Sequence, residues 1–399
     1  MKLIFLSLIC YDLLYEKEIS LHKDDPDYFD KEIVAHHSDP IHKWCKMLNM
    51  QGLNTELWYL SSFSKTSKSF IHKYGHPIRK IPGFNLKNYS TRHFDCDFSF
   101  QLFKELKREK ITHMLVLPYL MNELLPIDTF DILTLYCNKH KLKLFPVHGG
   151  STITQYGFIK KKLKSYLLKK VDGLICTGTA EYNIMINEFN YPTNKIHSFL
   201  NPLDMENFYP IAKKDSANFL NIDADLEYLV YAGRFVSTKG IQNLINIIPE
   251  LMAQHPKIRL LLLGRGPYQN ELISLIKYLR IDDAVKIIGE VPNDILKYYY
   301  SIASALVLPS YTEGTPNVLL EAIACNTICI ASNVGSIADI LGNGIGIMIP
   351  PKDESAILNA IYKALTGQFH INQKAREELL KEISLDNKGK QLKQILLIN

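Results

Sequence analysis

The segment Pro309-Ser-Tyr-Thr-Glu-Gly-Thr-Pro-Asn-Val-Leu-Leu-Glu-Ala, residues 309–322, decides the fold of this 399-residue chain. It follows the apolar run Ala303–Leu308, which predicts a buried strand of a parallel sheet. Apolar residues from Val318 onward predict a helix directly behind the turn. The turn therefore lies at the carboxyl end of a strand, where open α/β sheets bind their ligands.

Two glutamates, Glu313 and Glu321, bracket this turn. Backbone N–H groups at the start of the predicted helix, near Asn317 and Val318, favour an anion. A carboxylate accepts hydrogen bonds from vicinal hydroxyls, so one glutamate could bind a sugar and the other a ribose. The pattern thus indicates a sugar nucleotide, although a surface glutamate and a solvated helix glutamate would give the same spacing.

Upstream, three more segments repeat the order of strand, glycine-containing turn and helix. The strand Leu229–Ala232 leads into a loop with two cations, Arg234 and Lys239, which could hold a diphosphate. The same loop could instead be a solvated basic turn. The strands Ile258–Leu263 and Val285–Ile288 also end at glycines. Four such units in succession predict a doubly wound parallel sheet.

Four motifs match, in order and spacing, those of one enzyme family: Gly-Arg-Phe…Lys-Gly at 233–240, Leu-Gly-x-Gly-Pro at 263–267, Gly-Glu-Val-Pro at 289–292 and Pro-Ser-x-x-Glu-Gly-x-Pro-Asn-Val-Leu-Leu-Glu-Ala at 309–322. They closely resemble the nucleotide-binding half of glycosyltransferase family 4. Residues 201–210 resemble the segment that these enzymes carry before their interdomain linker, with Pro202 in place of a glycine.

The resemblance implies the α/β fold called GT-B, in which two Rossmann-like doubly wound parallel-sheet domains face a cleft. It implies a hexosyltransferase that moves a sugar from a nucleoside diphosphate sugar to a hydroxyl acceptor with retention of configuration. A UDP-sugar is favoured as donor, and the acceptor would be a glycan, a glycolipid or a lipid-linked saccharide. No metal is expected, because fixed cations can offset the charge of the leaving diphosphate.

The resemblance also assigns roles to residues. Arg234 and Lys239 would neutralise the departing diphosphate, Glu313 would orient the sugar and Glu321 would bind the ribose. His148 follows the apolar strand 142–147, precedes two glycines and would lie beside the transferred sugar; a turn histidine bonded to backbone is the alternative. The remaining histidines are expected to be structural. Further residues expected at the nucleotide are Gly264, Gly266, Glu290, Val291, Gly314, Thr315, Asn317 and Val318.

The length exceeds what one hydrophobic core usually holds and predicts two domains. Residues 1–205 are expected to form an acceptor-binding domain and residues 206–385 a nucleotide-sugar-binding domain. Residues 386–399 are expected to form a helix that crosses back to the first domain. The N-terminal half alternates as well, with strands predicted over 2–9, 55–60, 113–117 and 143–147 and helices over 40–50, 98–110 and 128–139.

One departure from the family pattern concerns the acceptor. The first strand is followed by a long polar stretch, residues 12–39, and not by the usual Gly-Gly loop. That loop commonly touches the donor phosphate and the acceptor, so the sequence leaves the acceptor open.

Composition is that of an ordinary globular enzyme. No run of 18 apolar residues is present, so no membrane-spanning helix is expected, and the apolar residues 2–9 are expected to form a buried strand and not a signal sequence. The seven cysteines have no paired spacing and indicate reduced thiols, as in a cytoplasmic protein.

Three other interpretations are compatible with parts of the sequence. Asp95-Cys-Asp97 could hold a divalent metal, but the pattern recurs at 25–27 and 223–225 as chance would give, and Asp97 stands where a helix N-cap belongs. A dinucleotide-dependent oxidoreductase could use the glycines at 264 and 266, yet no Gly-x-Gly-x-x-Gly follows the first strand. A non-catalytic module that binds nucleotide sugars is the third alternative.

The densest positive cluster, Lys160–Lys170, alternates with apolar residues at helical spacing. Such a helix could contact an anionic membrane surface or an acidic acceptor, which would place the protein on the inner face of the membrane. A solvated helix face is the equal alternative. Nucleic acid is not an expected partner, because the net charge of +5 is spread over the chain.

Overall fold

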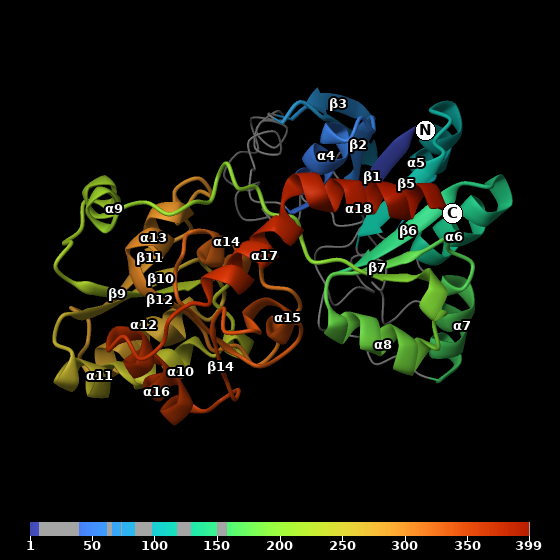
Figure 1. Cartoon of the computed structure of the whole chain (residues 1–399). Helices are drawn as coiled ribbons and strands as arrows, with labels where there is room; N and C mark the ends of the chain where they lie inside the picture. Colours follow the sequence, from blue (N-terminus) through green and yellow to red (C-terminus); the bar gives the residue numbers. More distant parts are fainter. Residues whose placement is uncertain are drawn as a thin grey trace. The chain divides into compact units, whose positions relative to one another are not determined.

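The computed structural model describes residues 1–7, 40–61, 66–72, 74–83, 98–117, 129–149 and 158–398. The chain divides into two compact units (Figure 1). Unit 1 comprises residues 1–202 and 385–399, and unit 2 comprises residues 203–384. Each unit is built around its own sheet, as predicted for two doubly wound domains.

Among its described residues, unit 1 contains an eight-stranded sheet in the order β3-β4-β2-β1-β5-β6-β7-β8. All neighbouring strands are parallel except β3 and β4, which form an antiparallel hairpin. The strands are β1 (Leu3–Ser7), β2 (Thr55–Ser61), β3 (Lys68–Ile71), β4 (Pro77–Pro82), β5 (His113–Leu117), β6 (Lys143–His148), β7 (Leu174–Cys176) and β8 (Ile196–Ser198).

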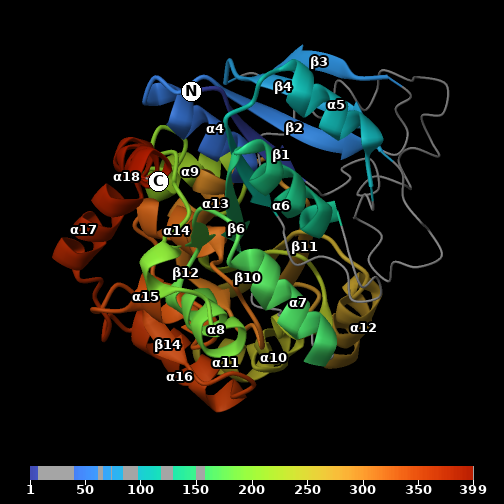
Figure 2. The same cartoon turned by 90° about the vertical axis from the view of Figure 1, so that its right-hand side faces the viewer.

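Helices cover both faces of this sheet. They are α4 (Pro40–Met50), α5 (Phe100–Arg108), α6 (Thr129–His140), α7 (Phe158–Leu168), α8 (Thr179–Phe189) and the C-terminal α18 (Leu385–Ile398), with a short 3₁₀ turn at Thr193–Lys195. α18 packs along α4 (Figure 2). Gln51 Nε2 donates to Asp386 Oδ1 at 3.1 Å, and Lys393 Nζ donates to the carbonyl oxygen of Gln51 at 2.8 Å. The last helix of the chain therefore belongs to the core of unit 1.

Unit 2 contains a six-stranded parallel sheet in the order β11-β10-β9-β12-β13-β14. The strands are β9 (Glu227–Ala232), β10 (Ile258–Leu263), β11 (Val285–Gly289), β12 (Ala303–Leu308), β13 (Cys329–Ser332) and β14 (Ile347–Ile349). The chain proceeds outward from β9 to β11 and then returns to the other side of β9 with β12. The sheet thus reverses its strand order between β9 and β12, which is where a doubly wound sheet opens a crevice.

The helices of unit 2 connect these strands (Figure 1). They are α9 (Lys213–Leu220), α10 (Ile241–Asn246), α11 (Ile248–Gln254), α12 (Gln269–Leu279), α13 (Leu296–Ile302), α14 (Asn317–Ala324), α15 (Ile337–Leu341), α16 (Glu354–Leu365) and α17 (Gln373–Ile383), with the 3₁₀ turn η2 at Ser237–Lys239. Among the described residues, no helix of either unit has the length and apolarity needed to span a membrane.

The structure corrects one local assignment in unit 1. The N-cap of α5 is Ser99, whose Oγ accepts a hydrogen bond from the backbone N–H of Leu102 at 3.1 Å. Asp97 is therefore not the cap. Both Asp95 and Asp97 lie outside the described residues, as does the polar stretch 12–39.

Candidate active site

The loops that follow β9 and β12 meet at the reversal of strand order in unit 2. The backbone N–H of Tyr311 donates to the carbonyl oxygen of Thr238 at 2.8 Å. Gly240 has a positive φ of 65°, and a Cβ on it would lie 2.1 Å from the carbonyl oxygen of Pro309. Only glycine allows this close approach, which fixes the β9 loop against the β12 loop.

The two loops carry an ion pair. Lys239 Nζ lies 2.6 Å from Glu313 Oε1, and the Ser310 hydroxyl donates to the same oxygen at 2.6 Å. Glu313 is buried, whereas the side chain of Lys239 keeps 23% of its exposure. Two predicted site residues, one from each motif, are thus in direct contact, and Ser310 supplies a third group that sequence reasoning did not single out.

Glu321, the second glutamate of the segment, lies inside unit 2. It is buried on α14, and the Tyr300 hydroxyl donates to its Oε2 at 3.2 Å. Burial, followed by the nearby Glu321 carboxylate, raises the pKa of Tyr300 well above its ordinary value, so this hydroxyl remains a donor. Tyr300 therefore orients the carboxylate that was predicted to bind ribose.

Arg234, the other predicted cation, is exposed at the start of the β9 loop. The loop backbone around it is held firmly, because the Tyr231 hydroxyl donates to the carbonyl oxygen of Arg234 at 3.1 Å. The side chain of the following residue, Phe235, is fully buried. The loop thus presents one cation to solvent and holds the other, Lys239, against Glu313.

The Gly-x-Gly turn after β10 packs on the β9 loop. A Cβ on Gly264 would lie 2.0 Å from the carbonyl oxygen of Gly233, and a Cβ on Gly266 would lie 2.2 Å from that of Phe235. These glycines are required for close contact between the backbones of the β10 turn and the β9 loop. This packing role explains them without a bound dinucleotide. The neighbouring turn after β11 carries Glu290, which is exposed and lies 2.7 Å from Arg265 Nε.

The start of α14 completes the candidate site. The N-cap residue is Pro316, which makes no side-chain capping bond, and Thr315, Asn317 and Val318 beside it are half-buried. Because the helix N-terminus is partly positive, this position suits a phosphate. The backbone at Gly335 packs directly against the backbone of Glu313, because a Cβ on Gly335 would lie 2.1 Å from the carbonyl oxygen of Glu313.

His148 belongs to unit 1, where it ends β6. It is buried, and burial lowers its pKa to about 4. The imidazole is therefore neutral at pH 7 and can offer one N–H donor and one acceptor. Its predicted neighbour Gly150 lies outside the described residues.

The structure changes the interpretation of the lysine-rich helix α7. Lys164 is fully buried, and its Nζ forms an ion pair with Asp131 Oδ1 at 2.7 Å. It is therefore not part of a cationic outer face. Phe158 and Ile159, by contrast, are 72% and 85% exposed, and Tyr166 is also exposed. The outer face of α7 combines lysines with large apolar side chains.

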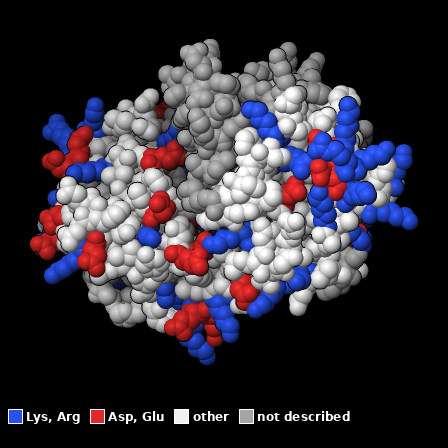
Figure 3. All heavy atoms as spheres, turned by 90° about the horizontal axis from the view of Figure 1, so that it is seen from above, with Lys and Arg blue, Asp and Glu red and all other residues white. Residues whose placement is uncertain are grey.

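Charges elsewhere on the surface are mixed in sign. Lys and Arg gather at the right-hand edge of the face shown in Figure 3, with Asp and Glu among them. One network on unit 1 pairs Arg79 with Glu56, Glu105 and Glu109. Hydrogen bonds from Lys2 and then Arg79 lower the pKa of Glu109 to about 2. These cations stabilise the packing of α5 on the sheet.

Comparison with known families finds a match over most of unit 2. The family model described as "Glycosyl transferases group 1" matches residues 212–382. The gpi3 subunit of phosphatidylinositol N-acetylglucosaminyltransferase from Schizosaccharomyces pombe is 29% identical over 207 residues, 52% of this chain and 42% of that protein. Glycogen synthase from Mycobacterium tuberculosis is 28% identical over 216 residues, 54% of this chain and 50% of that protein. The chain spans about half the length of the curated relatives that it matches.

Solved structures extend the likeness to the whole chain. Sucrose-phosphate synthase of Thermosynechococcus elongatus matches with a TM-score of 0.72 at 18% identity, covering 99% of this chain and 98% of that chain. HepE of Anabaena in complex with UDP matches with a TM-score of 0.71 at 12% identity, covering 100% of both chains. This likeness confirms the predicted GT-B fold.

Proposed function

We propose that this chain, whose residues 212–382 match the family model of the group 1 glycosyl transferases, transfers a sugar from a nucleoside diphosphate sugar to a hydroxyl acceptor. The observation that carries the proposal is the contact of Lys239 with Glu313 at the strand reversal of unit 2, 2.6 Å between Nζ and Oε1. A site for a diphosphate and a sugar needs a cation for the phosphates next to a hydrogen-bond acceptor for the sugar hydroxyls. This pair supplies a cation for the first and a hydrogen-bond acceptor for the second.

The donor diphosphate would exchange partners with this ion pair. Its oxygens bind Lys239, the exposed Arg234 and the N-terminus of α14, all of which favour negative charge. Glu313 then loses its cation and accepts hydrogen bonds from the sugar hydroxyls. Because these cations are fixed before reaction, they stabilise the charge that develops on the leaving diphosphate.

The reaction proposed is a transfer with retention of configuration. The bond between the anomeric carbon and the diphosphate oxygen breaks, and the acceptor oxygen forms the new bond on the same face. The acceptor proton passes to the leaving phosphate, which balances the step without a protein nucleophile. We propose that neutral His148 donates or accepts a hydrogen bond at a hydroxyl of the transferred sugar, as the family resemblance implies.

A UDP-sugar is the favoured donor, because HepE, which shares the fold, was solved with UDP and with UDP-glucose. A thermal-shift panel of UDP-, GDP-, ADP- and dTDP-sugars, with NAD added, tests this choice. The correct nucleotide raises the melting temperature because it binds only the folded protein. At a concentration of 100 times its Kd it adds about 2.7 kcal/mol to the free energy of unfolding. Stabilisation by NAD and by no nucleotide sugar would favour the oxidoreductase alternative.

Replacing Glu313 tests catalysis directly. Glu313→Gln should lower kcat/KM. The fall should correspond to a loss of roughly 2 to 4 kcal/mol of transition-state stabilisation, as when one preorganised polar contact is removed. The matched control is Glu250→Gln, an exposed glutamate on α11 that has no assigned role in the site, which should keep most of the turnover. Wild-type turnover in a folded Glu313→Gln protein would refute the assignment.

We further propose that the acceptor is presented at an anionic membrane surface, on its cytoplasmic side. The support is the outer face of α7, where the exposed Phe158, Ile159 and Tyr166 lie among lysines. Aromatic and aliphatic side chains enter the interfacial region of a bilayer while lysines contact anionic head groups. A lipid-linked or glycolipid acceptor would then be held close to the enzyme.

A further inference from the structure

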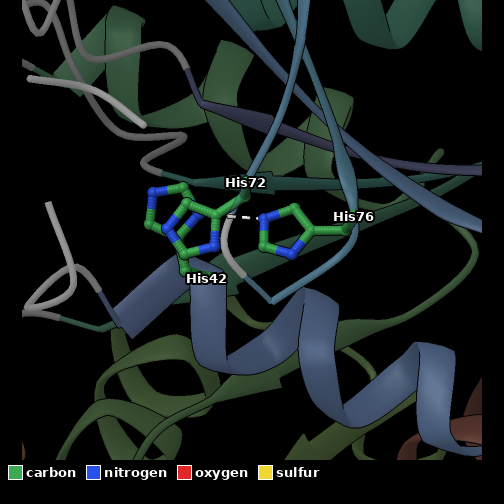
Figure 4. Close-up of side chains that lie close together, drawn as sticks. All are labelled: His42, His72 and His76. Carbon is green, nitrogen blue, oxygen red and sulfur yellow. Dashed lines mark hydrogen bonds between the residues drawn. The ribbon is translucent and has the colours of Figure 1, made fainter. Parts of the chain in front are cut away.

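Three histidines of unit 1 converge at one point, and none of them is assigned to the transfer reaction. His42 lies in the first turn of α4, His72 directly follows β3, and His76 directly precedes β4 (Figure 4). All three are buried, and one ring nitrogen from each lies within 4.8 Å of the others. The cluster therefore joins a helix to both ends of the turn in the β3–β4 hairpin.

From this geometry we propose that His42, His72 and His76 form a binding site for Zn²⁺ or a similar borderline transition-metal ion. His42 Nδ1 and His76 Nε2 are already 2.9 Å apart. Two nitrogens of a tetrahedral zinc site lie about 3.4 Å apart, because each Zn–N bond is about 2.05 Å long. Opening this pair by about 0.5 Å would admit the ion.

The third ligand needs a small turn of its ring. The imidazoles of His42 and His72 are stacked, with centroids 3.9 Å apart and planes 4° apart, so their lone pairs do not yet converge. The backbone N–H of Tyr74 donates to the lone pair of His72 Nδ1 at 3.2 Å, so this hydrogen bond must be released before Nδ1 can bind the ion. Rotation of the His72 ring about its terminal side-chain torsion, which is soft for histidine, directs a nitrogen toward the other two.

The protonation state of the cluster suits a metal. All three imidazoles are buried, and burial disfavours the charged form of histidine. Neutral imidazole is the form that binds metals. Among the described residues, His76 Nδ1 has no hydrogen-bond partner although it is buried. The ion would bind His76 through Nε2, the nitrogen that faces His42, and would replace the hydrogen bond between the two rings.

The ligand set selects the kind of ion. Mg²⁺ and Ca²⁺ prefer oxygen ligands, and this cluster offers imidazole nitrogen only. Zn²⁺ accepts three histidines and takes water in the fourth position. The ion would fasten the first turn of α4 to the edge hairpin. It would not replace the cations Arg234 and Lys239, which lie in unit 2.

Metal binding to the full chain tests the proposal. After dialysis against a chelator, the protein should bind one Zn²⁺ per chain in competition with a chromophoric chelator of micromolar affinity, and Zn²⁺ but not Mg²⁺ should raise its melting temperature. His42→Gln, His72→Gln and His76→Gln should each weaken zinc binding at least about 100-fold. The matched control is His197→Gln on β8, because burial lowers the pKa of that unit 1 histidine as well. Zinc affinity that is equal in the four variants, or no zinc retained by the wild type, would leave a hydrogen-bonded histidine stack only and overturn the site.

A measurement on the wild type avoids variants that fail to fold. X-ray absorption at the zinc edge should show nitrogen neighbours at about 2.0 Å with the outer scattering pattern of imidazole rings. A sulfur neighbour at about 2.3 Å would instead place the ion at cysteines and refute the assignment.

Discussion

Lys239 should contribute to folding and to transfer through different partners, and replacing it separates the two contributions. Its ammonium lies 2.6 Å from the buried Glu313 carboxylate, which also accepts a hydrogen bond from Ser310. Lys239→Met removes the charge and keeps most of the aliphatic stem. The variant leaves a buried carboxylate with the Ser310 hydroxyl and without a cation.

The size of the effect follows from the burial of the two groups. Removing one partner of a fully buried ion pair costs about 3–5 kcal/mol. The Lys239 side chain is 23% exposed and Ser310 still donates, so we expect a loss of about 2 kcal/mol. In a unit of this size that corresponds to a fall in melting temperature of about 4–8 °C. Turnover should fall at least about 100-fold, or 2.7 kcal/mol, because the leaving diphosphate loses a fixed cation.

Calorimetry of the full chain and nucleotide release from saturating donor measure the two losses. Arg234→Met is the control from the same loop: its exposed side chain should cost turnover without stability. Adding Glu313→Gln to Lys239→Met should restore most of the stability, since a neutral amide needs no cation, but none of the activity. A Lys239→Met protein with wild-type melting, or a coupling energy to Glu313 below about 0.5 kcal/mol, would refute the reasoning.

Four further outcomes are expected. In melting experiments, Gly264→Ala should lower the free energy of unfolding of unit 2 by more than about 3 kcal/mol, because the new Cβ would collide with the backbone of Gly233. Gly289→Ala should lower it by about 1 kcal/mol, because its positive φ is strained for alanine but the space around it is open. Lys162→Glu should weaken the salt-sensitive binding of the protein to anionic vesicles and keep the fold, whereas Lys164→Glu should unfold unit 1. Unchanged vesicle binding of the Lys162→Glu protein would argue that the outer face of α7 is only solvated. The folded pKa of His148, about 4, lies below its unfolded value near 6.5, so its contribution is present above pH 6.5 and is lost as pH falls toward 4; His148→Asn should flatten that part of the stability curve. Transfer should be indifferent to added Mg²⁺ or Mn²⁺, and activity that EDTA abolishes and Mn²⁺ restores would overturn the assignment of the fixed cations.

The sequence was most informative where a motif is contiguous. The strand predicted at 303–308 and the helix behind it are β12 and α14, because an apolar run followed by Gly-x-Pro has few other conformations. The fold of both units was predicted and is confirmed. The hairpin of β3 and β4 was not predicted, since its strands are short and mix charged with apolar residues.

The contacts within the site depend on tertiary structure, which the pattern of residues does not contain. Nothing in either motif indicates that Lys239 pairs with Glu313 and not with a ligand, or that Tyr300 orients Glu321. Likewise, Lys164 looks like its neighbouring lysines in sequence, and only the position of Asp131 on α6 makes it a core residue.

The ion pair between Lys239 and Glu313 also bears on which ligand the site retains. A nucleoside diphosphate without its sugar would bind Lys239 and so separate it from Glu313. The buried Glu313 carboxylate would then keep the Ser310 hydroxyl as donor but lose its cation, which costs free energy. An intact donor offsets that cost, because its sugar hydroxyls replace the ammonium as donors to Glu313. After transfer the sugar departs, and Lys239 gains by returning to Glu313. We therefore propose that the pair of Lys239 and Glu313 favours binding of the donor over the diphosphate product and assists release of that product.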